Sequence, residues 1–245
     1  MNRDIQIFAH RGSKGTHPEN TMAAFKEAER AGADGIEFDV HMSRDGQLVI
    51  IHDEKLDRTT FRHGLVKDYD AEELTGMDAG SFFAKEYESE RIPLLEEVFE
   101  WAVSNKLKMN VEIKTDKIAY EGIEEKIIDL IGKYHLEERI ILSSFNHTSL
   151  DKARSINPQI ERALLFQGLP ANIVDVLKHA REKGFHPDRK SLTKEIIQNA
   201  RELGYKVRPW VANKKNDLLL MKQYGVDAVI TDYPERALAL LKDHQ

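Results

Sequence analysis

The chain has 245 residues, of which 41% are hydrophobic and 32% are charged, and it contains no cysteine. The lack of cysteine excludes disulfides, thiolate zinc sites and thiol nucleophiles. With 36 basic and 42 acidic residues the net charge is −6, which argues against a general nucleic-acid binder. No run is long and apolar enough for a membrane span, and the first residues do not resemble a secretory signal. We therefore expect a cytoplasmic protein without integral membrane contact.

Apolar segments of strand and helix character alternate along almost the whole chain, a pattern typical of parallel α/β proteins. The predicted parallel strands begin near residues 5, 36, 108, 139, 161, 185, 206 and 228. The first helix is capped by Asn20-Thr21 and stops at Gly32, and the later ones cover 95–104, 120–134, 148–156, 171–183, 193–203, 214–224 and 234–242. Eight such units predict a single α/β domain, residues 1–245, with the (β/α)8 TIM-barrel fold. The sixth strand, which ends at Pro187, is the weakest.

Two segments interrupt this alternation. Residues 48–52 follow the second strand after the turn Asp45-Gly46, which predicts an antiparallel hairpin outside the parallel count. Residues 54 to about 93 show no βα rhythm and are rich in glycine and aromatic residues, so we predict a small inserted subdomain there. Its Phe61, Phe82 and Phe83 either pack over the barrel mouth or contact an acyl chain.

The hairpin carries the first candidate site. Glu37 and Asp39 are two residues apart on one strand and so share a face, and the turn brings His52 back opposite one of them. These acids are either the solvated face of an edge hairpin or a site for a cation, and the apolar residues between them favour the site. Glu112 and Lys114 share a face in the same way, as an ion pair or as site residues. The three carboxylates offer only hard oxygen ligands, which suits one divalent cation, Mg²⁺ or Ca²⁺.

Other polar residues gather at the carboxyl ends of the predicted strands. His10 and His52 supply two imidazoles, the side-chain type that serves most often in general acid–base catalysis near neutral pH, while Arg11 and Lys114 make a cationic pocket for a phosphate. Trp210 is either core or an aromatic wall for a small polyol. We interpret Asn20 and Asp232 as helix caps, Glu19 as a helix-dipole partner and His186 as ambiguous. The remaining histidines are expected at the surface: His17, His41, His63, His135, His147, His179 and His244.

These motifs resemble the glycerophosphodiester phosphodiesterase family, of the cytoplasmic bacterial type. The likeness runs over nearly the full length: His10-Arg11-Gly12, Pro18 to Thr21, Ala33 to Val40, Asp45-Gly46, His52-Asp53, Leu56 to Thr60, Ile92 to Val98, Glu112-Ile113-Lys114, Ser143 to Asn146, Trp210 to Asn213 and Thr231 to Pro234. One departure is Trp210-Val211-Ala212-Asn213, where the family usually has Trp-Thr-Val-Asn.

The resemblance implies a barrel with an insertion after the His52 strand and a cation held by Glu37, Asp39 and Glu112. It implies catalysis by His10 and His52, and substrate binding by Arg11, Lys114, Trp210 and Asn213. The implied reaction is hydrolysis of a small glycerophosphodiester to glycerol 3-phosphate and an alcohol, through a cyclic phosphate. The neighbouring glycerol hydroxyl attacks phosphorus, and the order in which the histidines act stays open.

Three alternatives remain at this point. The first is phosphodiesterase activity of the lysophospholipase D type, on lipids with one acyl chain. The second is a non-catalytic polyol-phosphate binding protein, which the retained histidines and carboxylates disfavour. The third is a metal-dependent sugar isomerase, which gives no reason for the pair His10-Arg11.

Overall fold

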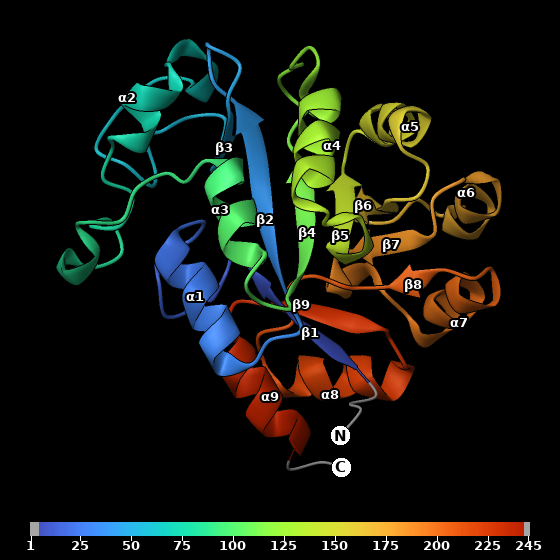
Figure 1. Ribbon diagram of the computed structural model, residues 1–245. Coiled ribbons are helices and arrows are strands. Elements are labelled where there is room, and N and C mark those ends of the chain that lie inside the picture. The colour runs from blue at the N-terminus through green and yellow to red at the C-terminus, as the bar shows by residue number, and fades with distance from the viewer. Residues whose placement is uncertain (1–4, 243–245) are drawn as a thin grey trace.

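Within residues 5–242, which the computed structural model describes, eight parallel strands form a nearly closed TIM barrel (Figure 1). In sheet order they are β8 (Lys206–Val207), β7 (Gly184–Pro187), β6 (Glu161–Phe166), β5 (Ile140–Ser144), β4 (Lys108–Ile113), β2 (Gly35–Met42), β1 (Gln6–His10) and β9 (Ala228–Thr231). The predicted barrel is confirmed. The shortest of these strands is β8, the seventh along the chain, so the prediction that the sixth is weakest was wrong. Pro209 follows β8 closely and has no N–H to continue the ladder.

The ring is completed across the gap between β8 and β9 by Trp210. This residue forms isolated parallel bridges to Asp188 on one side and Ile230 on the other. The Ile230 N–H donates to the Pro209 carbonyl at 3.0 Å, and the Ala212 N–H donates to the Ile230 carbonyl at 2.9 Å. Trp210 therefore both closes the barrel and lies at its mouth.

Helices cover the outside of the barrel and bury its apolar strand faces. They are α1 (Met22–Ala31), α3 (Leu95–Ala102), α4 (Ile123–Tyr134), α5 (His147–Ile156), α6 (Ile173–His179), α7 (Lys194–Glu202), α8 (Lys215–Tyr224) and α9 (Pro234–Lys242). Buried side chains from helices and strands form two large clusters around the barrel, while a smaller one, including Phe8, Ile141 and Ile230, lies with Trp210.

The first helix shows how the local sequence sets an element boundary. Thr21 is its N-cap and accepts from the Ala24 N–H, and Gly32 ends it in the left-handed conformation with φ +81°. Just before it, the loop after β1 passes so close to α1 that a Cβ on Gly12 would lie 2.6 Å from the Cβ of Ala24. Glycine at this position therefore allows the loop that carries Arg11 to lie against the helix.

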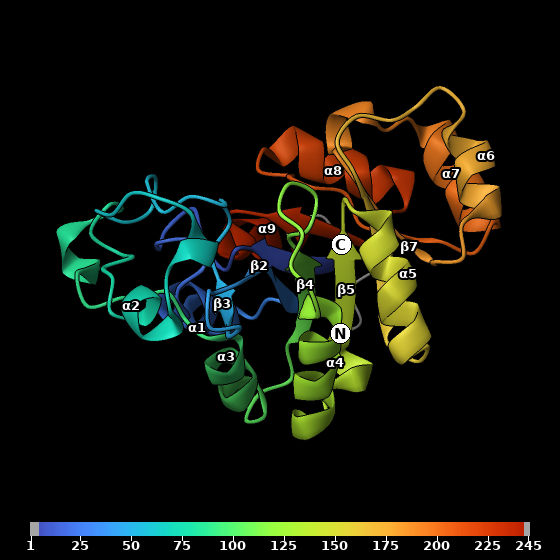
Figure 2. The same cartoon turned by 90° about the horizontal axis from the view of Figure 1, so that it is seen from above.

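The predicted hairpin is present: β3 (Leu48–Ile50) pairs antiparallel with β2, with Val40 opposite Ile50 and Met42 opposite Leu48. The segment that follows has no parallel strand and contains α2 (Ala71–Thr75) with two 3₁₀ helices, Val66–Asp68 and Lys85–Tyr87. It buries its own small cluster, which includes Leu56, Val66, Leu74, Met77 and Ile92. Viewed from above, this insertion lies beyond β3 on one side of the barrel, with α5, α6 and α7 on the other (Figure 2).

Candidate active site at the mouth of the barrel

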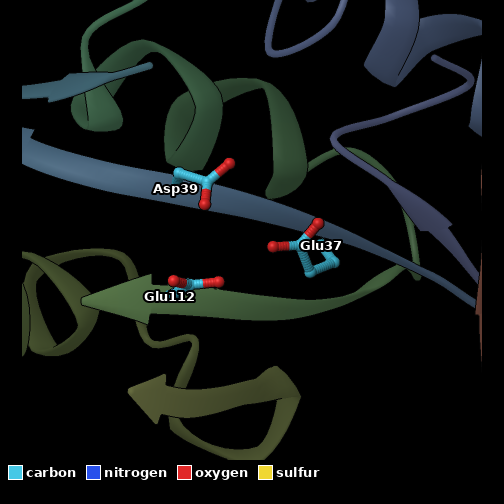
Figure 3. Close-up of side chains that lie close together, drawn as sticks. All are labelled: Glu37, Asp39 and Glu112. Carbon is cyan, nitrogen blue, oxygen red and sulfur yellow. The ribbon is translucent and has the colours of Figure 1, made fainter. Parts of the chain in front are cut away.

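Three carboxylates lie close together on the neighbouring strands β2 and β4 (Figure 3). Glu37 and Asp39 come from β2 and Glu112 from β4, with Asp39 paired in register with Glu112. One oxygen of each lies within 4.8 Å of the others, and all three residues are buried. The two-residue spacing on β2 and the parallel register of β4 therefore bring these side chains together, as the sequence predicted.

Crowding of three buried acids changes how readily they ionise. Burial, and then the negative charge of Asp39, raises the pKa of both Glu37 and Glu112. Burial alone would raise the pKa of Asp39 too, but His52, Lys114 and Arg11 hold it below its ordinary value. Buried acids of like charge with oxygen-only donors fit a hard divalent cation, which would neutralise the repulsion. The Asp39 Oδ1 atom also makes no hydrogen bond within the described residues.

Two cations lie directly beside this cluster. Lys114 Nζ donates to Glu112 Oε1 at 2.8 Å and lies 3.7 Å from Asp39 Oδ1, so the predicted ion pair is present within the site itself. Asp39 and Glu112 raise the pKa of Lys114 against the opposing effect of burial. Arg11 approaches through Nε, 3.6 Å from Asp39 Oδ2, and its backbone N–H donates to Glu37 Oε2 at 2.9 Å. Positive charge thus faces the cavity next to the acids.

The side chain of His10 is oriented by Asp232, which follows the last strand of the barrel. Its Nδ1 lies 2.6 Å from Asp232 Oδ1, and Asp232 Oδ2 accepts from the Asn213 amide at 2.6 Å. Burial lowers the pKa of His10 although Asp232 opposes this, and the pKa of Asp232 is about 2 because its bonds to His10 and Asn213 outweigh burial. The interpretation of Asp232 as only a helix cap was therefore wrong, since its carboxylate orients a site histidine. A proton on Nδ1 leaves Nε2 as the free ring nitrogen.

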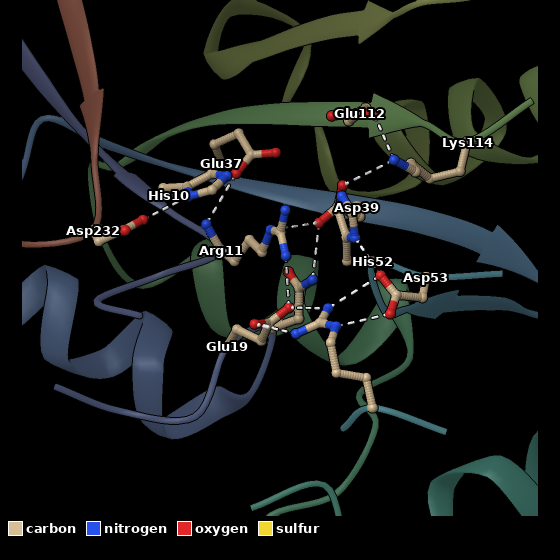
Figure 4. A network of polar contacts seen from close by, with 12 residues as sticks. His10, Arg11, Glu19, Glu37, Asp39, His52, Asp53, Glu112, Lys114 and Asp232 are labelled. Carbon is tan, nitrogen blue, oxygen red and sulfur yellow. Dashed lines mark hydrogen bonds and ion pairs between the residues drawn. The ribbon is translucent and has the colours of Figure 1, made fainter. Parts of the chain in front are cut away.

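His52 has a similar carboxylate partner but a different surrounding (Figure 4). Its Nδ1 lies 2.6 Å from Asp53 Oδ1, and Arg58 of the insertion donates to Asp53 Oδ2 at 2.8 Å. The same guanidinium donates to both Glu19 oxygens at 2.8 Å, and Glu19 in turn accepts from Arg11 at 2.7 Å. A chain of charged groups therefore connects His52 to Arg11.

Several residues of this network had been given simpler interpretations. Asn20 does not cap the first helix: it has φ +57°, and its amide donates to Asp39 Oδ2 at 2.9 Å. Glu19 binds two arginines rather than the helix dipole. His52 is not directly opposite Glu37 or Asp39, because the hairpin register pairs Val40 with Ile50 and so places Ile51, whose N–H donates to the Asp39 carbonyl, opposite Asp39.

Unlike His10 and His52, the residues His41 and His186 are fully buried. His41, expected at the surface, places Nδ1 2.9 Å from the Tyr120 hydroxyl and Nε2 3.1 Å from the His52 carbonyl, and burial lowers its pKa to about 4. His186 lies inside the barrel beside Arg208. The position predicted for His244 lies outside the described residues.

A cavity of about 380 Å³ opens beside the acids and histidines. It is lined by His10, Arg11, Glu37, His52, Asn110, Glu112, Lys114, Asp116, Lys117, Phe145, Leu165, Gln167, Trp210 and Ile230. Trp210 contributes an indole ring whose centroid is 5.9 Å from that of Phe145. Asn213 does not line the cavity, since its amide contacts Asp232 and Thr231 behind His10.

Sequence reasoning did not select Asp53, Arg58 or Asn110, and it underrated Asp232. A usable signal existed for Asn110, which precedes Glu112 by two residues on a buried strand and so shares its face. Asp53 stands next to His52 in the sequence. No local signal connects His10 to Asp232, because 222 residues separate them.

The chain is similar to known proteins both in sequence and in fold. The sequence profile of the glycerophosphoryl diester phosphodiesterase family matches residues 10–236. A glycerophosphodiester phosphodiesterase of Caldanaerobacter subterraneus subsp. tengcongensis is 42% identical over 236 residues, 96% of this chain and 97% of the relative. One from Bacillus altitudinis is 42% identical over 97% of this chain and 98% of its own. Among solved structures, an Oleispira antarctica phosphodiesterase in complex with the product sn-glycerol-3-phosphate superposes with a TM-score of 0.87 at 33% identity, covering 97% of this chain and 96% of that one.

Proposed function

Because the chain belongs to the glycerophosphoryl diester phosphodiesterase family and is an enzyme that hydrolyses glycerophosphodiesters, we propose that it does so with one divalent cation and two histidines. One observation carries the proposal. His10 and His52 line the same cavity as Glu37 and Glu112, and each has Nδ1 2.6 Å from a carboxylate oxygen. Two imidazoles oriented in this way are suited to move protons at two oxygens of one phosphorus.

The cation would be held by Glu37, Asp39 and Glu112, as Mg²⁺ or Ca²⁺. When bound, it supplies positive charge for the non-bridging phosphate oxygens. Arg11 and Lys114 add hydrogen-bond donors beside the same acids, so negative charge that develops on the non-bridging phosphate oxygens would be stabilised by both side chains.

We assign a different proton transfer to each histidine because the two lie at different depths in the cavity. His10 has 12% of its side chain exposed and His52 has 31%, so His10 lies deeper. We assign His10 as the base that takes the proton from the glycerol 2-hydroxyl, which attacks phosphorus as the bond to the alcohol breaks. Burial lowers the pKa of His10, which favours the neutral imidazole that a base needs. His52, nearer the opening, gives a proton to the departing alcohol, which leaves towards solvent.

The second step completes the hydrolysis. Water attacks the cyclic phosphate, the ring bond to the 2-oxygen breaks, and the histidines exchange roles. An intramolecular nucleophile is favourable because its effective molarity can reach about 10⁵ M or more. Trp210 forms a wall for the glyceryl carbons, and Asn213 acts on substrate only through Asp232 and His10.

The deciding experiment compares a glycerophosphodiester with its analogue whose 2-hydroxyl is replaced by hydrogen. The analogue keeps the phosphate contacts, so we expect similar KM and negligible kcat. A comparable kcat for the analogue would mean that water attacks directly. Turnover of single-chain lysophospholipids in preference to water-soluble diesters would support the lysophospholipase D-type alternative, for which Phe61 and Phe83, 70% and 41% exposed, offer apolar contacts on the insertion.

No helix among residues 5–242 has both the length and the hydrophobicity needed to cross a bilayer. Cytoplasmic location and a single domain over residues 1–245 remain predictions from the sequence.

A further inference from the structure

Asn110 is a buried polar side chain that lines the cavity and whose carbonyl oxygen makes no hydrogen bond within the described residues. It lies on β4, is 1% exposed, and its Oδ1 has no partner among the described residues. Its backbone is paired in register with Glu37 on one side and Ile141 on the other. An unpaired buried amide costs stability unless a ligand or water meets it, so the position calls for a partner.

Its surroundings identify the kind of partner. Asn110 is two residues before Glu112 on one strand face, which places it about 7 Å deeper in the barrel than that carboxylate. The other side chains that line the cavity without charge include Leu165, Ile230 and Trp210. The indole Nε1 of Trp210 already donates to the His186 carbonyl at 2.9 Å, so this ring offers only its apolar surface. A ligand group here must be small, with apolar sides and one hydroxyl.

We infer that Asn110 determines specificity by hydrogen-bonding the terminal hydroxyl of the glyceryl group, an inference that rests on the proposed function. With phosphate beside Arg11 and Lys114, a three-carbon chain extends inward from the Glu112 level to the Asn110 amide. A hydroxyl both donates and accepts, and an amide does the same, so the two groups satisfy each other. An alcohol without this hydroxyl would leave the amide buried and unpaired, which is how polar sites reject deoxy analogues most strongly.

The alternative is that Asn110 only positions Glu37, its neighbour on β2. Loss of such a positioning residue would slow every diester by the same factor. Loss of a residue that hydrogen-bonds the terminal hydroxyl would instead change the ratio of kcat/KM between two substrates that differ only in that hydroxyl. The ratio therefore separates the two roles.

The test uses a glyceryl p-nitrophenyl phosphodiester and the corresponding propane-1,2-diol diester, which keeps the attacking hydroxyl and lacks the terminal one. We expect kcat/KM of the wild-type enzyme to favour the glyceryl diester at least about tenfold. Asn110→Leu, close in volume, should bring the ratio close to one. Leu165→Ala, which trims an apolar wall of the same cavity, should lower both activities and leave the ratio unchanged.

A binding measurement keeps the inference independent of turnover. Calorimetry should show glycerol 3-phosphate binding the wild type more tightly than propane-1,2-diol 1-phosphate, with the difference lost in Asn110→Leu. Thermal melting verifies the fold, and Asn110→Ser replaces the leucine variant if that one does not fold. A preference that survives in the folded variant, or equal treatment of both substrates by wild type, overturns the inference. Failure to hydrolyse either diester would instead reject the proposed function, while the binding arm would still decide the role of Asn110.

Discussion

His10 and His52 have the same immediate partner, a carboxylate oxygen 2.6 Å from Nδ1, yet the protein builds the two pairs differently. The partner of His10 is Asp232, at the carboxyl end of β9, and Asn213 holds that aspartate in turn. The partner of His52 is the adjacent residue, and Arg58 of the insertion holds it. The His10 pair is largely buried, whereas both members of the His52 pair have 31% of their side chains exposed.

The same arrangement, a histidine bonded to a carboxylate, is therefore supported by different parts of the fold in the two pairs. The orientation of His10 depends on closure of the barrel, since β1 pairs with β9. The orientation of His52 depends on how the insertion packs against the loop that carries Glu19. Variants can therefore weaken one pair and spare the other, and their order of severity tests whether the comparison is right.

The largest loss of turnover is expected from changes at the three carboxylates of the site, Glu37, Asp39 and Glu112. Removal of the cation should reduce turnover to background, because a divalent ion supplies several kcal/mol to the transition state, equivalent to 10³-fold or more. Diester turnover before and after EDTA, with metal content verified, measures this. Glu112→Gln should raise the metal concentration needed for half-activity without unfolding the protein. Full activity in the metal-free enzyme would remove the cation from the mechanism.

Next come the histidines themselves. His10→Ala and His52→Ala should each lower kcat roughly 10²–10⁴-fold, the usual range for a lost general acid or base. The double variant should lose much less than the product of the two, because the catalysts act as a unit. A diester with the good leaving group p-nitrophenol should rescue His52→Ala alone, since p-nitrophenolate is a weak base that leaves without a proton from an acid. Rescue of His10→Ala instead would exchange the roles, and near-normal turnover of both single variants would reject two-histidine catalysis.

The carboxylate partners should separate the two regions directly. Asp232→Asn should lower kcat roughly 100-fold and Asp53→Asn roughly tenfold, within the range for partners that orient a functional imidazole. The first loss is larger because the side chains of the His10 pair are less exposed to water than those of the His52 pair, so water replaces the lost carboxylate less readily. Asp57→Asn is the matched control, since Asp57 lies 2.9 Å from His63 in an exposed pair. Equal losses from Asp232 and Asp53 would contradict the comparison.

The pH profile sharpens the assignment of His10. Burial lowers the pKa of this histidine, so the acidic limb of kcat/KM should fall below pH 6.5, the ordinary value. Asp232 opposes the shift, and its replacement by asparagine should therefore move the limb to still lower pH. The measurement is kcat/KM against pH for wild type and Asp232→Asn. A limb that moves upward would mean that the group observed is not His10.

The smallest effect is expected at Arg58, whose side chain is 45% exposed. Burial would raise the pKa of Glu19, but Arg58 and Arg11 lower it from 4.5 to about 2. A lowered carboxyl pKa stabilises the fold above pH 4.5, and this contribution fades as pH falls towards 2. Arg58→Gln should thus lose about 1 kcal/mol at pH 7 and less near pH 3, measured by urea unfolding. Arg62→Gln, an exposed neighbour, serves as control, and an equal loss at both pH values would exclude the linkage.

Whether a feature could be predicted from the sequence depends on how close together in the chain its residues are. The hairpin, the alternation of strands and helices, and the shared face of Glu37 and Asp39 each depend on residues close together in the sequence. The structure shows all three as expected. Closure by Trp210 and the support of His10 by Asp232 depend on the return of the chain to its start. Asn20 was misassigned because its sequence fits a helix cap, whereas tertiary contacts hold it in a left-handed conformation beside Asp39.

The pairing of His10 with Asp232 also has a consequence for synthesis on the ribosome. A nascent chain that has emerged as far as Asn213 already contains both histidines, the three acids and both cations of the site. It lacks β9, and therefore the strand beside β1 and the carboxylate behind His10. Domains fold as units while translation proceeds from the N-terminus. We therefore expect full activity only after the last strand and Asp232 have left the exit tunnel and docked beside β1 and His10.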